Sequence, residues 1–225
     1  MSIKDLYHVE RISFSDCKEW ILYKHYAHRI PSISYAFGLF DNDNILQGVC
    51  TFGRCAFPEM ELICGDEYKD EVIQLNRLIV NQSEKNMTSF FISQCFKKIT
   101  EHKIILSYSD INQNHHGYIY QATNFLYTGI TNPGMETYTV SGGEGCIKDM
   151  TRRYFFKATT VYNQKWNILK ITKGGCKHRY IYFIGTKKEK KEMRSALKYE
   201  VQPYPKGDNK NYDASYQPTI QGRLF

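Results

Sequence analysis

The spacing of apolar residues is most regular between residues 73 and 131. Ile73–Val80 and Lys103–Tyr108 are apolar runs of strand length. Between them an apolar side chain returns at every fourth position, which predicts one buried face of a helix over Met87–Thr100: Met87, Phe91, Cys95 and Ile99. Asn86 stands where this helix needs an N-cap.

The pattern continues with a second helix near His115–Asn124 and a strand over Phe125–Thr131. A β-α-β-α-β order predicts a sheet with helices packed against it. We expect the strands Ile73–Val80 and Lys103–Tyr108 to be parallel neighbours, joined by the first helix in a right-handed crossover.

Upstream, the pattern predicts a strand, a helix and a hairpin. Asp5–Phe14 is the first strand, and a Ser-Asp pair can cap the helix over residues 15–24. Ile33–Phe40 and Ile45–Phe52 alternate in polarity and are joined by a turn-rich Asp-Asn-Asp-Asn sequence. These two runs therefore predict a β-hairpin.

The pattern is weaker after Gly129. Lys177–Gly185 predicts a strand and Lys187–Lys198 a basic helix. The glycine-rich Ser141–Gly145 lacks the strand-to-helix context and the Lys-Ser/Thr pair of a phosphate loop, so we expect a flexible turn. Residues 209–225 have no apolar period and predict a flexible tail.

These elements predict an α+β fold with a mixed sheet, because hairpin strands are followed by crossover helices. The length suits one large domain. We expect a single domain over residues 1–208, with a core at 5–140 and a C-terminal extension at 141–208.

Composition changes this picture in two respects. The formal net charge is +7, and aromatic residues reach 15%, with 18 tyrosines. Excess Lys and Arg with many aromatic rings favours a polyanion that also offers bases for stacking. The same charge also fits a soluble protein with a basic surface.

The seven cysteines form no C-x-x-C pair. Met1–Glu10 has no secretory signal pattern, and no apolar stretch approaches the roughly 18 residues of a membrane span. We therefore expect a reducing cytoplasm and no membrane partner. Cys176 and His178 form the one close Cys/His spacing, which is too few ligands to predict zinc.

Candidate chemistry gathers at two places. The first is the predicted end of the first helix, just before a proline: His25, Tyr26, His28 and Arg29. The second is the end of the Lys103–Tyr108 strand, with Ser107 and Asp110, where ligands bind in open sheets. Asp110 equally suits the N-cap of the following helix.

The strand, loop and helix from Asn76 to Thr88 are similar to those of GNAT acyltransferases. The GNAT loop holds the coenzyme A pyrophosphate on backbone N–H groups at a helix N-terminus. That loop is usually glycine-rich, whereas this one has no glycine, so side-chain donors would compensate. The resemblance implies acetyl-CoA or a related thioester held by a set of residues: Arg77, Leu78, Val80, Lys85, Thr88, Ser89 and Asn124.

The more specific resemblance is to the Mom family of phage DNA-modification proteins. It rests on Leu75–Leu78, Ser107–Asp110, His116–Phe125 and Tyr127–Gly129, with weaker matches from about residue 20 to 206. Mom-like proteins are GNAT-like enzymes that place a carbamoylmethyl (acetamido) group on the exocyclic amine of adenine in DNA. This modification shields phage DNA from host restriction.

The resemblance implies a double-stranded DNA substrate in the host cytoplasm, during infection or from a prophage, and leaves a homodimer open. A paired adenine must be flipped or the duplex distorted. An arylamine needs a base to take its proton, and the candidates are His25 and Asp110. The implied catalytic residues are His25, Tyr26, Ser107 and Asp110. The expected DNA-binding residues are Arg29, Tyr120, Arg152, Arg153, Lys177 and Arg179.

The implied product raises a chemical problem, because a thioester delivers a carbonyl carbon and this group is attached through a methylene. Some activation is needed, and His25, His28 and Asp110 include the ligand types that suit iron. An adenine methyltransferase is disfavoured because Asn132-Pro-Gly-Met135 lacks the aromatic residue of that family's motif. A GNAT enzyme acting on a protein or small-molecule amine, and a non-catalytic basic DNA-binding protein, stay open.

Overall fold

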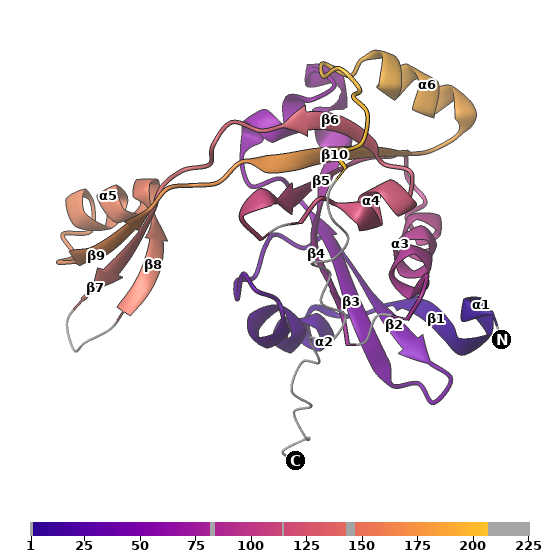
Figure 1. Cartoon of the computed structure of the whole chain (residues 1–225), viewed down its shortest axis with the longest axis horizontal. Coiled ribbons are helices and arrows are strands. Elements are labelled where there is room, and N and C mark those ends of the chain that lie inside the picture. The colour runs from indigo at the N-terminus through magenta and orange to yellow at the C-terminus, as the bar shows by residue number, and fades with distance from the viewer. Residues whose placement is uncertain (1, 82–83, 114, 143–146, 207–225) are drawn as a thin grey trace. The chain divides into compact units, whose positions relative to one another are not determined.

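The computed structural model describes residues 2–81, 84–113, 115–142 and 147–206. The chain divides into two compact units (Figure 1). The first comprises Met1–Tyr108, Gly117–Gly129 and Arg179–Phe225, and the second Ser109–His116 and Ile130–His178. These boundaries differ from those of the expected core and extension, and the single domain stays a prediction.

A seven-stranded mixed sheet forms the centre of the first unit (Figure 1). Its strands, in spatial order, are β1 (Tyr7–Arg11), β2 (Tyr35–Asp41), β3 (Leu46–Gly53), β4 (Val72–Val80), β5 (Lys103–Asp110), β10 (Lys177–Ile184) and β6 (Leu126–Ile130). Strands β1 to β4 pair antiparallel, and β4 pairs parallel with β5. The predicted hairpin, the parallel neighbours and the mixed sheet are therefore confirmed.

The helices that accompany these strands are mostly short. They are α1 (Ile3–Leu6), α2 (Phe14–Glu19) with a following π-helical turn (Trp20–Lys24), α3 (Met87–Lys98), α4 (Tyr118–Ala122) and α6 (Lys187–Ser195), with 3₁₀ turns at Pro58–Leu62, Asp66–Glu71 and Ile111–Gln113. Among the described residues, no helix is long and apolar enough to cross a membrane.

Side chains from the two faces of the sheet form separate cores, because successive strand residues point to opposite faces. On β5, Ile105 packs in one core with the predicted face of α3, which buries Met87, Phe91 and Cys95. The neighbouring Ile104 packs in the other core with Met193 of α6. The helix face inferred from the four-residue period is therefore confirmed.

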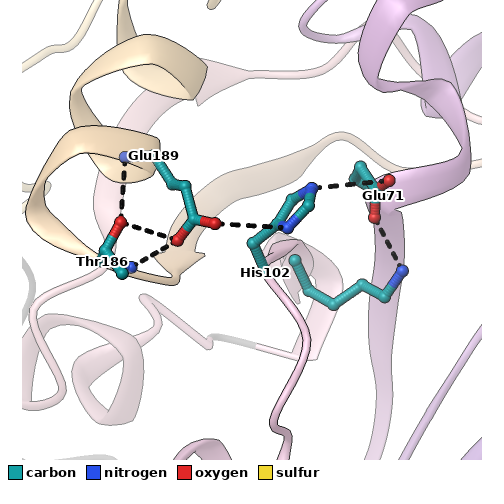
Figure 2. A network of polar contacts seen from close by, with 5 residues as sticks. Glu71, His102, Thr186 and Glu189 are labelled. Atoms are coloured by element: carbon teal, nitrogen blue, oxygen red, sulfur yellow. Dashed lines mark hydrogen bonds and ion pairs between the residues drawn. The ribbon is translucent and has the colours of Figure 1, made fainter.

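A polar network connects the start of α6 to the rest of the first unit (Figure 2). The backbone amide and hydroxyl of Thr186 donate to the Glu189 carboxylate at 2.7 and 2.8 Å, and these bonds lower its pKa. His102 lies 3.6 Å from both Glu189 and Glu71, and Lys103 contacts Glu71 at 2.8 Å. The helix start at Lys187 is therefore fixed by a capping box.

The second unit contains a three-stranded antiparallel sheet in the order β8-β7-β9 and a helix. These elements are β7 (Thr137–Ser141), β8 (Ile147–Thr151), α5 (Arg152–Thr160) and β9 (Asn167–Thr172). Tyr138, Val140, Met150 and Phe155 form its small core. Sequence analysis predicted none of these elements. The expected turn at 141–145 and the tail at 209–225 fall largely outside the described residues.

Several predicted boundaries are wrong. The start of the expected strand Asp5–Phe14 is helical, and α2 begins at Phe14 because Ser13 caps it, accepting from Asp16 N at 3.3 Å. Asn86 is left-handed at φ 69° and makes no side-chain cap hydrogen bond. The helix expected over His115–Asn124 is reduced to α4, because Gly117 before it is also left-handed.

Candidate active site

Strands β4 and β5 separate part of the way along their length. Within the described residues they pair only at Val72–Gln74 and Ile104–Leu106. At the next position the hydroxyl of Ser107, rather than a backbone amide, donates to Leu75 O at 3.2 Å. Beyond it, one backbone edge of β4 is open toward the carboxyl ends of the strands, which is where ligands bind in open sheets.

Ser107 and Tyr120 form a buried hydroxyl pair beside this opening. Ser107 is fully buried on β5, and Tyr120 reaches it from α4. Burial raises the pKa of Tyr120 to about 12, and the hydrogen bond with Ser107 opposes that rise. Tyr120 packs against Phe125 and Tyr180, with ring centroids 5.2 and 5.1 Å away. It therefore serves better as an inward-facing hydroxyl than as the DNA-binding residue expected from the sequence.

Tyr26 connects the Ser107–Tyr120 hydroxyl pair to the segment that follows α2 and its π-helical turn. Its charge contributes to raising the pKa of Tyr120 and opposes the lowering of the pKa of Arg77, so the ring lies near both. The side chain of Tyr26 is 56% exposed and stacks on His25, with centroids 4.4 Å apart. The predicted residues His25, Tyr26 and Ser107 thus converge in the first unit.

The contacts of His25 define which ring nitrogen carries its proton. Its Nδ1 accepts a hydrogen bond from Ala27 N at 3.0 Å. A neutral imidazole that accepts at Nδ1 carries its proton at Nε2. In this arrangement neither ring nitrogen can accept a further proton without losing this contact or this tautomer, which favours a role in orienting substrate over the predicted role of base.

Arg77 is a buried cation on β4. Its Nη1 donates to Asn76 O at 2.6 Å and its Nη2 to Arg29 O at 2.5 Å, while Nε has no hydrogen-bond partner among the described residues. Burial, and then the neighbouring Arg29, lower the pKa of Arg77. None of the ion pairs found among the described residues includes it. A buried guanidinium without a carboxylate is suited to an anionic ligand.

Asp110 lies in the second unit, where its carboxylate has two contacts. Oδ1 accepts from Asn112 N at 3.0 Å, and Oδ2 lies 3.8 Å from Lys177 Nζ. The first contact caps the 3₁₀ turn that follows β5, whereas the alternative expected from the sequence was the N-cap of the following helix, a position that Gly117 occupies. That Asp110 shares a site with His25 stays a prediction.

The residues at the start of α3 fit an anionic group of a cofactor. Thr88 Oγ1 is shielded from solvent and has no hydrogen-bond partner among the described residues. Lys85 and Asn86 line a cavity of about 380 Å³, although Glu84 adds a carboxylate there. Ser89 donates its hydroxyl to Asn86 O at 3.0 Å and is therefore already engaged.

Other predicted cofactor and metal residues have structural contacts. Leu78 and Val80 pack against the α3 core, and Asn124 is left-handed after the end of α4. The ring of His28 contacts Leu22 O at 2.8 Å. No group of three His, Cys, Asp or Glu side chains among the described residues is placed to hold a metal ion, so the iron prediction gains no support.

The expected DNA-binding residues divide between the two units. Arg29 is exposed in the first unit, whereas Arg179 donates to Thr128 at 2.8 and 2.9 Å and covers the Tyr199 ring. Arg152, Arg153 and Lys177 belong to the second unit. Sequence analysis missed Cys50, which lies close enough to affect the pKa of Tyr120 and gives no signal in the sequence.

The fold and the residues around the opening define a mixed α/β protein with a cationic, hydroxyl-rich site between two parallel strands. The Mom protein family model matches residues 6–206, and the chain belongs to that family. A search of curated proteins finds no match.

Three solved structures resemble the chain. A putative acetyltransferase from Acinetobacter baylyi is 11% identical, with 81% of this chain and 94% of that chain covered and a TM-score of 0.45. The putative acetyltransferase yncA from Salmonella typhimurium, solved with acetyl-CoA, is 9% identical, with 80% and 95% covered and a TM-score of 0.44. NAA60 from Arabidopsis thaliana, in complex with acetyl-CoA, is 13% identical, with 79% and 98% covered and a TM-score of 0.41.

Proposed function

We propose that this chain is a transferase that modifies the exocyclic N6 amine of adenine in double-stranded DNA. The proposed product carries an acetamido group and protects the DNA from restriction. Membership of the Mom protein family supports the substrate and the product. The geometry of the first unit supports a site that handles an anionic, aromatic substrate.

The environment of Arg77 is the observation on which the proposed substrate site rests. Its guanidinium is buried without a carboxylate and lies near the exposed Tyr26 ring. A phosphate would supply the missing charge, and a base extruded from the duplex would supply a ring to stack on Tyr26. A nucleic acid offers both features in one molecule.

The reaction requires that the adenine amine lose a proton as its new bond forms. Asp110 is the proposed base, because His25 carries its proton at the nitrogen not engaged by Ala27. His25, stacked on Tyr26, helps to orient the substrate. Tyr120 is a buried hydroxyl that donates a hydrogen bond where negative charge develops on oxygen, and Ser107, whose own hydrogen goes to Leu75 O, lies beside it and positions it.

A coenzyme A thioester is the proposed cofactor. Thr88 and Lys85 would hold its phosphates, and the open backbone edge of β4 after Leu75 would hold its chain. When bound, this group supplies an activated carbonyl carbon. The acetamido group is attached through a methylene and carries an amide nitrogen, so a thioester alone does not supply it and a second donor of these atoms is required. The mass of the product distinguishes simple acyl transfer from the family's modification.

Mass spectrometry of nucleosides tests the proposal. DNA from cells that express the chain should contain an adenine adduct with the mass of the acetamido product. Arg77→Met should lose the adduct, whereas Arg11→Met, a change at another arginine on a β-strand, should keep it. Unmodified DNA together with acylated protein or small amines would overturn the DNA assignment. DNA binding without any product would favour a non-catalytic binding protein.

A further inference from the structure

Helix α5 of the second unit presents a face that the fold does not use. Phe155 and Ala158 are buried against its sheet. Residues three and four apart share a face of a helix. The side turned away from the buried pair therefore carries Arg153, Phe156 and Lys157, and all three are exposed.

The aromatic ring on this face lies among cations. Phe156 is 48% exposed, and the guanidinium of Arg152 lies 5.8 Å from its ring centroid. The ammonium of Lys157 lies 5.5 Å from the centroid of Tyr162, which is also exposed. A single exposed ring needs no explanation by itself. Here the ring lies beside the Arg152 guanidinium and between Arg153 and Lys157 on the helix surface, which brings aromatic and positive groups together on one face.

The described acidic groups of the second unit make their contacts elsewhere than at Arg153 and Lys157. Asp110 contacts Lys177 at 3.8 Å, Glu136 contacts Arg152 at 3.7 Å, and Asp149 accepts from Thr139. No ion pair involves Arg153 or Lys157 within the described ranges. Further positive charge lies beyond the helix, at Lys165, Lys170 and Lys173.

We propose that the exposed face of α5 binds the DNA substrate outside the active site. Arg153 and Lys157 contact phosphates, and Phe156 stacks against or inserts between bases. Alternating cations and aromatic rings match the two parts of a nucleic acid, its charged backbone and its flat bases. The identity of the nucleic acid as substrate rests on the proposed function.

Charge and shape favour DNA over two other occupants. A helix that lies on a membrane needs a broad apolar stripe, and the outer face of α5 has one large apolar side chain, Phe156, between charged ones. A second copy of the chain would bring the same positive charge to this face and would be repelled. A polyanion with aromatic groups matches both the positive charge and the exposed aromatic ring of this face.

The test measures binding of the full-length protein to a fluorescent DNA duplex by anisotropy over a series of salt concentrations. Arg153→Ala and Lys157→Ala should each reduce the slope of log affinity against log salt by about one unit. Phe156→Ala should weaken binding about tenfold and leave the slope unchanged, because stacking releases no counterions.

Matched substitutions in the first unit control for charge and ring loss. Lys97→Ala removes an exposed lysine of α3, and Phe14→Ala removes a ring that is 49% exposed. Both should bind DNA like the unaltered chain. All variants should keep the melting temperature, because each side chain is exposed.

The two proposals fail in different ways. Unchanged affinity and slope in the α5 variants, with adduct still formed, would overturn the α5 surface alone. Absence of adduct together with weakened binding by the variants would overturn the proposed reaction and support the surface. Equal loss of binding to phosphatidylserine vesicles in the variants, with no change for DNA, would assign the face to a membrane instead.

Discussion

Arg77 occupies a position that costs the fold free energy. Removing a charged group from water costs several kcal/mol unless a partner charge and hydrogen bonds compensate. Here two carbonyl oxygens accept from the guanidinium and Nε has no partner among the described residues. Such a group is retained for what it binds, and its stability cost and its function can be separated by mutation.

Arg77→Met should abolish the adenine adduct without lowering the melting temperature. Methionine fills a similar volume and removes the buried charge, a kind of change that is often neutral or stabilising. Thermal unfolding by circular dichroism measures the stability. A clear drop in melting temperature would show that the guanidinium is structural.

Asp110→Asn should lower formation of the adduct by roughly 10²–10⁴-fold, the usual effect of losing a catalytic base. Asparagine keeps an oxygen that accepts from Asn112 N, so the turn stays capped. The contact with the half-exposed Lys177 contributes at most about 1 kcal/mol to the free energy of unfolding. Modification near the wild-type level with an unchanged melting temperature would assign Asp110 a structural role only.

His178 should make the protein less stable in mild acid. Burial, and then the neighbouring His116, lower its pKa, and the two rings lie 5.8 Å apart. As the pH falls through the usual histidine range near 6.5, the unfolded chain takes up a proton that the folded chain excludes, so the free energy of unfolding decreases.

Melting temperatures measured between about pH 5 and 8 test this dependence. His178→Gln should flatten the curve, because it removes the buried group whose pKa is lowered. A curve of equal steepness in His178→Gln would assign the acid sensitivity to other groups.

At the scale of elements, the sequence predicts a helix or strand correctly where the segment is long and its apolar residues recur at a regular spacing. The α3 face and the runs that became β4 and β5 were predictable, because each buries many side chains in one pattern. The elements β7, β8 and β9 are short, and β9 is exposed along its whole length. An exposed strand has no apolar alternation to detect, since its pairing comes from the backbone.

Gly117→Ala tests how α4 begins. Gly117 has φ 73°, and a Cβ there would meet the ring of Tyr180. We expect a loss of about 2–4 kcal/mol, from left-handed strain plus overpacking. Asn124→Ala, at an exposed left-handed residue of φ 61° after the same helix, should cost less than about 1 kcal/mol. Chemical denaturation measures both, and equal losses would exclude the ring contact as the cause.

At the scale of the molecule, the sequence predicts the members of the site better than their roles. His25, Tyr26 and Ser107 were predictable because chemistry-bearing residues cluster at element ends. The inward position of Tyr120 and the burial of Arg77 depend on contacts between distant segments, which no local pattern encodes. Asp110 caps a 3₁₀ turn instead of the helix expected from the sequence, and its place in catalysis stays a prediction.

Truncation tests how the first unit depends on its late segments. A chain that ends at Cys176 lacks β10 and α6, and we expect no cooperative thermal transition, because the core around Ile104 loses its cover. A chain that ends at Lys206 keeps every described element and should melt like the full chain. A sharp transition in the shorter chain would show that β1 to β6 fold without it.

The position of β10 between β5 and β6 also governs how the protein is made. The ribosome finishes β6 at Ile130 and reaches β10 only at Lys177, so the two outer neighbours exist before the strand that joins them. The nascent chain must keep both edges apart and unaggregated while the second unit is synthesised. Such distant pairings slow folding, and the yield of active protein should therefore depend on the speed of translation across residues 131–176 and on chaperones that shield those edges.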